Sequence, residues 1–268
     1  MPMISAMPNT DFPGLPARQQ FGGQSIRLFL LLLPLALSGC AALQPLVSDF
    51  NIVSVDEENQ LSQKMSAEIA KSMKLSADAT LNQKVNTVGN KLVAALPSKQ
   101  FNYRFYVVEE PSPNAFTIPG AGIYVHTGLF KLATSEGELA GVLAHEIGHA
   151  YERHPAKGIS RQYGLEYVSG LLFKQNKNQL QQLALNYAKG GILNKYGRGD
   201  EREADDIAFD LLRKSGYSPD GLILFFKKLQ QISKGSGVPE FLSSHPPTPE
   251  RIERLEQLKL QTTHVSRV

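Results

Sequence analysis

The sequence predicts an α+β fold in which helices dominate and a small β-sheet lies next to one of them. Apolar residues recur at helical spacing through most of the chain after position 57, which indicates amphipathic helices. The region 103–125 instead contains two short stretches with strand character. The third observation is a helical segment with the pattern H-E-x-x-H, from His145 to His149.

Residues 1–39 have the pattern of a leader peptide. Arg27 precedes ten largely apolar residues, too few to cross a bilayer, which takes about 20. The sequence L-S-G-C that follows is similar to a bacterial lipobox, so we expect Cys40 to be lipidated and 40–56 to form a tether. The residue after this cysteine is Ala41 rather than an aspartate, which resembles the pattern of lipoproteins that are sent to the outer membrane. The alternative is a chance apolar run that ends in a buried cysteine.

The domain proper is expected at 57–268. Its first part divides into helices, strands and a loop. The signals are periodic apolar residues for the helices, alternation for the strands, and a run rich in Pro and Gly for the loop. We expect, in order, helices at 57–75 and 77–96, a strand at 103–109, a loop at 111–122 and a second strand at 123–125.

The helix that carries the H-E-x-x-H pattern has a recognisable start. Ser135 and Glu138 have the spacing of a capping box, and an apolar stripe continues to about position 153. Residues four apart project from one face, so His145 and His149 could bind one metal ion while Glu146 lies beside a water. The alternative is a surface helix with two incidental histidines.

A catalytic zinc ion takes three protein ligands and keeps one position open, so a hydrolase needs one more donor. The acidic sequence from Asp200 to Asp206 supplies it and opens an amphipathic helical segment. Glu201 could bind the metal, and Asp205, one turn later, could support a ligand histidine. The alternative is an acidic first turn that interacts with the helix dipole.

The segment 157–199 is rich in polar residues and Gly, and we expect it to form a lid over the site, with a helix at 176–188. Helices at 220–231 and 248–260 complete the domain. His245 lies before the last helix, and three roles are open to it. It could be an oxyanion donor, a fourth metal ligand that keeps the enzyme inactive, or a loop histidine bonded to backbone.

The remaining histidines, His126, His154 and His264, are expected to be structural or exposed. His154 follows the motif closely. Its offset of five from His149 predicts that it lies on a different face of the helix.

Four motifs together resemble the gluzincin metallopeptidases of the HtpX and CAAX prenyl protease family, above all its periplasmic proteases. They are the H-E-x-x-H helix, E-R-E-A-D at 201–205, N-A-F-T-I-P-G at 114–120 followed by G-I-Y-V at 122–125, and S-H-P-P-T-P-E-R at 244–251. The resemblance covers roughly 57–258 and implies a zincin-like metalloprotease domain with one zinc ion. It implies that His145, His149 and Glu201 are the zinc ligands and that Glu146 is the general base. It also implies that Asp205 is the outer partner of a ligand and that His245 is a further active-site residue.

The resemblance also implies an endopeptidase that acts on unfolded or misassembled envelope proteins, including outer-membrane proteins and their assembly machinery. We expect Asn114, Ile123 and Tyr124 at the substrate, because an exposed strand edge beside the zinc could pair with an extended peptide. Two ordinary core strands are the alternative. A competing function is a chaperone-like assembly factor for outer-membrane proteins, with its proteolysis repressed.

Composition limits the other classes of function. The chain has 268 residues, of which 42% are hydrophobic and 20% charged, as in an ordinary globular domain. Its formal charge of +3 becomes +2 without 1–39, since two arginines and one aspartate leave, and so indicates no nucleic-acid partner. Cys40 is the single cysteine, so the metal ligands cannot be thiolates. The leader, in turn, predicts a lipid-anchored protein of the bacterial outer membrane that faces the periplasm.

Overall fold

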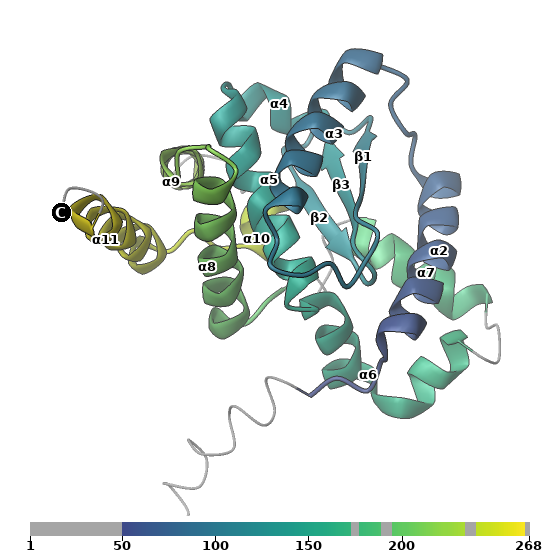
Figure 1. Cartoon of the computed structure of the whole chain (residues 1–268). Coiled ribbons are helices and arrows are strands. Elements are labelled where there is room, and N and C mark those ends of the chain that lie inside the picture. Colours follow the sequence, from purple (N-terminus) through teal and green to yellow (C-terminus); the bar gives the residue numbers. More distant parts are fainter. Residues whose placement is uncertain (1–49, 173–176, 189–194, 234–239, 266–268) are drawn as a thin grey trace, which may run out of the picture. The chain divides into compact units, whose positions relative to one another are not determined.

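Figure 1 presents the computed structural model of the chain, which describes residues 50–172, 177–188, 195–233 and 240–265. The predicted leader, the lipidation site Cys40 and most of the predicted tether lie outside these ranges. Within them, no helix combines the length and the apolar character that crossing a membrane requires.

A three-stranded sheet lies in the middle of the domain, in the order β1-β3-β2. Strand β1 (Arg104–Val108) runs parallel to β3 (Gly122–His126), whereas β2 (Ala115–Ile118) runs antiparallel to it. The sequence predicted a loop where β2 lies. That prediction was wrong because β2 has only four residues, between Pro113 and the Pro119-Gly120 turn, so loop signals outweigh its strand character.

Helices cover both faces of this sheet (Figure 1). Helices α3 (Ala79–Ala94) and α5 (Glu136–Tyr151) pack on one face, where Ile123 and Val125 join the larger core. Helices α2 (Val55–Ser72) and α7 (Lys177–Ala188) pack on the other, where Phe116 and Tyr124 join a second core. Because both faces are covered, β2 and β3 are buried throughout and do not alternate between core and solvent.

The domain begins earlier than the sequence predicted. Ser54 and Glu57 form a capping box at the start of α2, and Val53 is only 2% exposed. The carbonyl of Val53 accepts a hydrogen bond from Arg153. The end of the predicted tether therefore contacts the domain at Ile52 and Val53.

Helix α5 starts as predicted, because Ser135 and Glu138 form the capping box that the sequence indicated. Lys228 adds an ion pair to Glu138 at 2.5 Å. The helix ends at Tyr151, and Arg153 has a left-handed backbone with φ of 60°. The chain therefore changes direction before the next helix, α6 (His154–Leu172).

The remaining helices hold α5 in place. Helices α8 (Arg198–Lys214) and α9 (Asp220–Ser233) pack directly on α5 (Figure 1). The short helices α4 (Leu129–Leu132) and α10 (Glu240–Ser244) were not predicted, while α11 (Pro249–Val265) was, with Thr248 accepting a hydrogen bond at its start. The contact of α5 with α8 brings the H-E-x-x-H motif against the acidic segment.

Candidate metal centre

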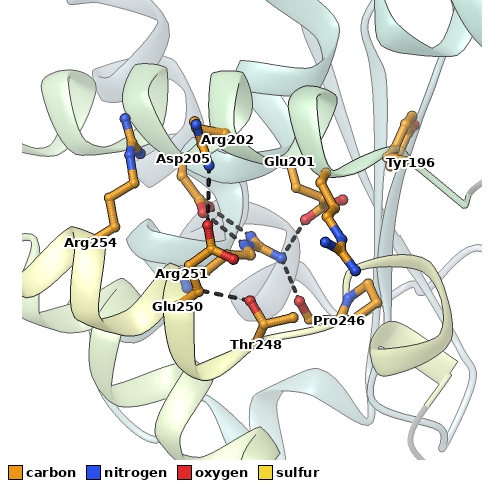
Figure 2. A pocket seen from close by; sticks show the side chains of 10 residues that line it. Tyr196, Glu201, Arg202, Asp205, Pro246, Thr248, Glu250, Arg251 and Arg254 are labelled. Carbon is orange, nitrogen blue, oxygen red and sulfur yellow. Dashed lines mark hydrogen bonds and ion pairs between the residues drawn. The ribbon is translucent and has the colours of Figure 1, made fainter. Parts of the chain in front are cut away.

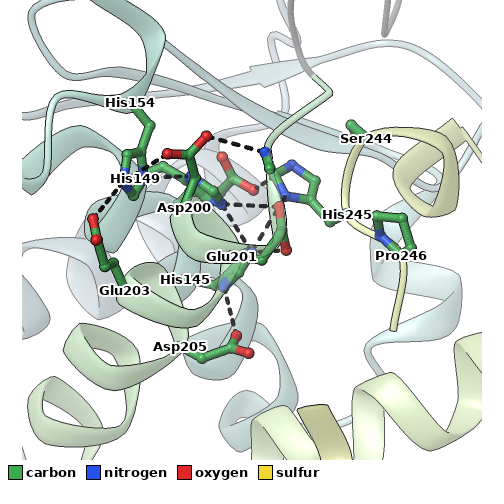
Figure 3. A network of polar contacts seen from close by, with 12 residues as sticks. His145, His149, His154, Asp200, Glu201, Glu203, Asp205, Ser244, His245 and Pro246 are labelled. Carbon is green, nitrogen blue, oxygen red and sulfur yellow. Dashed lines mark hydrogen bonds and ion pairs between the residues drawn. The ribbon is translucent and has the colours of Figure 1, made fainter. Parts of the chain in front are cut away.

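Helices α5 and α8 and the loop after α10 bring four donor side chains together (Figure 3). Ring nitrogens of His145, His149 and His245 and a carboxylate oxygen of Glu201 all lie within 4.8 Å of one another. The three histidines are fully buried and Glu201 is 3% exposed. Side chains 100 residues apart in the sequence, such as His145 and His245, therefore share one buried cluster.

The distances between these donors suit a single metal ion. The Nε2 atoms of His145 and His149 are 3.1 Å apart, and each lies 3.5 Å from an oxygen of Glu201. Nδ1 of His245 lies 3.0 Å from Glu201 Oε1 and 3.3 Å from His145 Nε2. Ligands at about 2.0–2.2 Å from a tetrahedral zinc ion are about 3.3–3.6 Å from each other. The residues present therefore fit such an ion.

Glu146 lies beside the donors and is not one of them. It is completely buried, and neither of its oxygens has a hydrogen-bond partner among the described residues. Its Oε1 lies 3.4 Å from Nε2 of His245. Burial raises the pKa of Glu146 above its ordinary value, and the neighbouring imidazoles offset this only in part. A carboxylate with a raised pKa takes up a proton more readily near neutral pH.

A buried guanidinium neutralises part of the negative charge. Arg251 contacts Glu201 Oε2 at 2.5 Å and the two oxygens of Asp205 at 2.7 and 2.8 Å. Burial by itself would raise the pKa of Glu201, but His245 and Arg251 outweigh it and hold that pKa well below its ordinary range. The two carboxylates of Glu201 and Asp205 outnumber the one guanidinium, which favours a cation at the centre.

Asp205 lies against the outer side of His145. Its Oδ1 is 3.1 Å from His145 Nδ1, so the carboxylate favours a proton on Nδ1, which would leave Nε2 free for a metal. Burial alone would lower the pKa of His145, yet Asp205 and Glu201 outweigh it and raise that pKa to about 9. The surroundings of this ring therefore stabilise a positive charge.

The sequence predicted that His154 lies on a different face from the motif histidines, but the structure places it against the centre. Its ring is fully buried, and its Nδ1 lies 2.9 Å from Nδ1 of His149. Burial lowers the pKa of His154, and it lowers the pKa of His149 further. The prediction was wrong because it assumed a continuous helix, whereas the chain turns at Arg153 between α5 and α6.

The structure excludes one of the three roles for His245. The ring nitrogens of His245 contact Glu201, His145 and Glu146, so it is not a loop histidine bonded only to backbone. Phe241 of α10 stacks on this ring with the centroids 4.7 Å apart. The roles of fourth ligand and oxyanion donor both stay open.

Sequence reasoning missed two further residues around the centre. Tyr196 stacks on His149, with the ring centroids 3.9 Å apart and the planes at 22°. Arg251 lies over the ring of Phe226, which in turn meets the ring of His145 edge-on. The only sequence signal for Arg251 is that it ends the S-H-P-P-T-P-E-R motif, and Tyr196 has no signal of its own.

The residues expected at the substrate occupy positions that differ from the prediction. Ile123 and Tyr124 lie in β3, the central strand, where β1 and β2 pair with the backbone on both sides. Neither residue can therefore pair with an extended peptide, and that part of the prediction was wrong. Asn114 precedes β2 and is fully buried, and its side-chain amide has no hydrogen-bond partner among the described residues.

A pocket of about 410 Å³ adjoins the centre on the outer side of Glu201 (Figure 2). Asp205 and Arg251 line it together with Glu201, and Tyr196 and Pro246 also border it. Open space therefore reaches the donor Glu201, whereas the three histidine donors do not line the pocket.

Comparison with known proteins agrees with this geometry. The model of Peptidase family M48 matches residues 79–259. The beta-barrel assembly-enhancing protease of Yersinia pestis is 32% identical over 226 residues, which is 79% of this chain and 46% of that protein. This chain thus spans less than half the length of that relative.

Two metalloproteases of Escherichia coli (strain K12) are also similar. The metalloprotease YcaL is 32% identical over 161 residues, which is 58% of this chain and 60% of that protein. The metalloprotease LoiP is 28% identical over 186 residues, which is 67% of this chain and 71% of that protein.

Proposed function

Because this chain belongs to peptidase family M48, we propose that it is a zinc-dependent endopeptidase that hydrolyses peptide bonds of unfolded or misassembled envelope proteins. The observation that carries this proposal is a buried set of metal donors with the carboxylate of Glu146, which is not one of them, directly beside it. A structural metal site does not require a carboxylate that is not a ligand, whereas a hydrolase requires one as a general base.

His145, His149 and Glu201 would hold the ion. When bound, zinc would supply a Lewis acid that polarises a peptide carbonyl and lowers the pKa of water to about 7. The negative surroundings created by Glu201 and Asp205 support a divalent cation over a neutral occupant.

Glu146 would take the proton of the attacking water and return it to the leaving amine. The carboxylate must be unprotonated at first and protonated later, and Glu146 lies directly beside the donors for both steps. General acid–base catalysis of this kind contributes about 100- to 10,000-fold.

His245 has two roles that fit this reaction. As a fourth ligand it would fill the position that water needs and would keep the enzyme inactive. As a donor it would stabilise the oxyanion. The contact of its Nδ1 with Glu201 and His145 supports the fourth-ligand role in this conformation.

The leader and the relatives support our proposals for the clients and the location. The name of the Yersinia pestis relative supports outer-membrane proteins, or their assembly machinery, as clients. We further propose lipidation at Cys40, attachment to the outer membrane and exposure to the periplasm. In the segment 157–199, which we propose as a lid, α7 packs against α2 and β2, and it would have to move before a peptide could reach the sheet.

A second candidate is a chaperone-like assembly factor for outer-membrane proteins with repressed proteolysis. The complete burial of Glu146 and the fourth donor His245 favour it, because His245 would take the coordination position that an attacking water needs.

A Glu146→Gln variant of the full-length chain, purified in detergent, separates the two candidates. The protease proposal predicts that this variant still binds unfolded protein but no longer degrades it, and that it fails to rescue a deletion strain. Full rescue by Glu146→Gln would instead support the assembly factor.

A further inference from the structure

A second histidine pair extends the centre toward the surface (Figure 3). Nδ1 of His149 lies 2.9 Å from Nδ1 of His154, and Nε2 of His154 lies 3.1 Å from a carboxylate oxygen of Glu203. A second carboxylate, Asp200, lies 3.7 Å from the same Nε2. The His154 ring is fully buried, whereas the side chain of Glu203 is 49% exposed.

The positions of these atoms decide where the protons lie. Two Nδ1 atoms in hydrogen-bond contact share one proton, so one ring donates and the other accepts. The carboxylates of Glu203 and Asp200 favour a proton on Nε2 of His154, which makes its Nδ1 the acceptor. His149 then donates through Nδ1–H and keeps an unprotonated Nε2, the atom that faces the other metal donors.

We infer that His154 is a positioning residue for the metal ligand His149, and that it acts by fixing the tautomer and orientation of that ring. This inference rests on the proposed function. The two ligand histidines then have different outer partners, since Asp205 serves His145 directly whereas Glu203 reaches His149 only through His154.

The backbone and neighbouring side chains hold the contacts from His149 through His154 to Glu203 in place. Arg153, with its left-handed backbone, turns the chain so that His154 points back at the motif helix, and its side chain is paired with the buried Glu58 at 2.6 Å. Arg161 holds Asp200 at 2.9 Å, beside the same ring. Tyr196 stacks on the face of the His149 ring and limits its rotation.

The test compares two substitutions of His154 in the full-length chain. His154→Leu removes the acceptor, whereas His154→Asn can offer Oδ1 near the position of Nδ1. His126→Leu is the matched control, because His126 is also fully buried and hydrogen-bonded but lies outside the centre. Zinc affinity is measured by competition with a chelator, and the tautomer of His149 by its ring ¹⁵N shifts.

We expect His154→Leu to bind zinc about 10- to 100-fold more weakly than the unaltered chain, the usual loss for an outer partner of a ligand. His154→Asn should recover most of that loss, and His126→Leu should bind zinc as the unaltered chain does. Glu203→Gln, at a half-exposed position, should weaken binding in the same direction even where His154→Leu fails to fold.

Equal zinc affinities in His154→Leu and His126→Leu would overturn the inference, as would unaltered binding and unaltered ¹⁵N shifts in Glu203→Gln. Either result leaves the proposed function intact, provided that the unaltered chain binds zinc. Failure of the unaltered chain to bind zinc would instead contradict the proposed function, and the inference with it.

Discussion

Gly148 of α5 lies directly against the backbone of Ala204 in α8: a Cβ atom at position 148 would be 2.7 Å from the Ala204 carbonyl oxygen. This contact sets the distance between the two helices that carry His149 and Glu201. Since the obstacle is backbone, it cannot be relieved by rotation of a side chain.

A Gly148→Ala substitution should therefore separate the two helices. We expect the free energy of unfolding to fall by about 1–3 kcal/mol, and zinc affinity to fall as well. Gly137→Ala is the matched control in the same helix, because its nearest obstacle is 4.0 Å away. The control should leave stability unchanged or raise it by up to about 1 kcal/mol. Denaturant titration and chelator competition measure the two effects, and equal results for both variants would refute the proposed role of the contact.

Arg251 should contribute more to the stability of the metal-free protein than to that of the zinc-loaded protein. An Arg251→Met substitution leaves Glu201 and Asp205 buried without their guanidinium, which typically costs about 3–5 kcal/mol. A bound cation would offset part of that cost. Thermal unfolding with and without zinc measures the difference. Arg202→Met is the control, because its ion pair with Glu250 is exposed and should contribute little.

Glu138 should give the domain a pH-dependent stability. Burial by itself raises the pKa of Glu138, but hydrogen bonds from Lys228, Ser135 and Thr134 outweigh it and lower that pKa below its ordinary value of 4.5. A lowered pKa in the folded state means that this stabilisation is complete above pH 4.5 and is lost as the pH falls through the folded-state pKa.

Glu138→Gln keeps the capping side chain but removes its charge. We expect it to lower the free energy of unfolding by about 1–2 kcal/mol at pH 7, and by progressively less below pH 4.5. Denaturant titrations from pH 3 to pH 8 test this. A difference between the two proteins that stays constant over that range would contradict the assigned role of the charge.

His245→Ala distinguishes the two roles of that histidine. If His245 is a fourth ligand, the substitution should weaken zinc binding and increase the cleavage of an unfolded protein. If it is an oxyanion donor, zinc affinity should stay the same while kcat falls by about 100- to 1,000-fold. The contacts of Nδ1 with Glu201 and His145 lead us to expect the first result.

The sequence predicted the parts of the site that depend on local pattern. The start of α5 follows from the Ser135–Glu138 spacing, and Glu201 follows from the acidic segment that opens an amphipathic helix and matches a family pattern. His154 was misjudged because its position depends on the backbone of Arg153, which no local pattern indicates. Ile123 and Tyr124 were misjudged because the strand order of the sheet is set by contacts distant in the sequence.

The metal content of the purified full-length chain is the most direct test of the central claim. Elemental analysis and chelator competition should find one tightly bound zinc ion per chain, and Glu201→Gln should bind it far more weakly. An unaltered chain that binds no zinc, or a Glu201→Gln variant that binds it equally well, would contradict the claim that His145, His149 and Glu201 form one metal site.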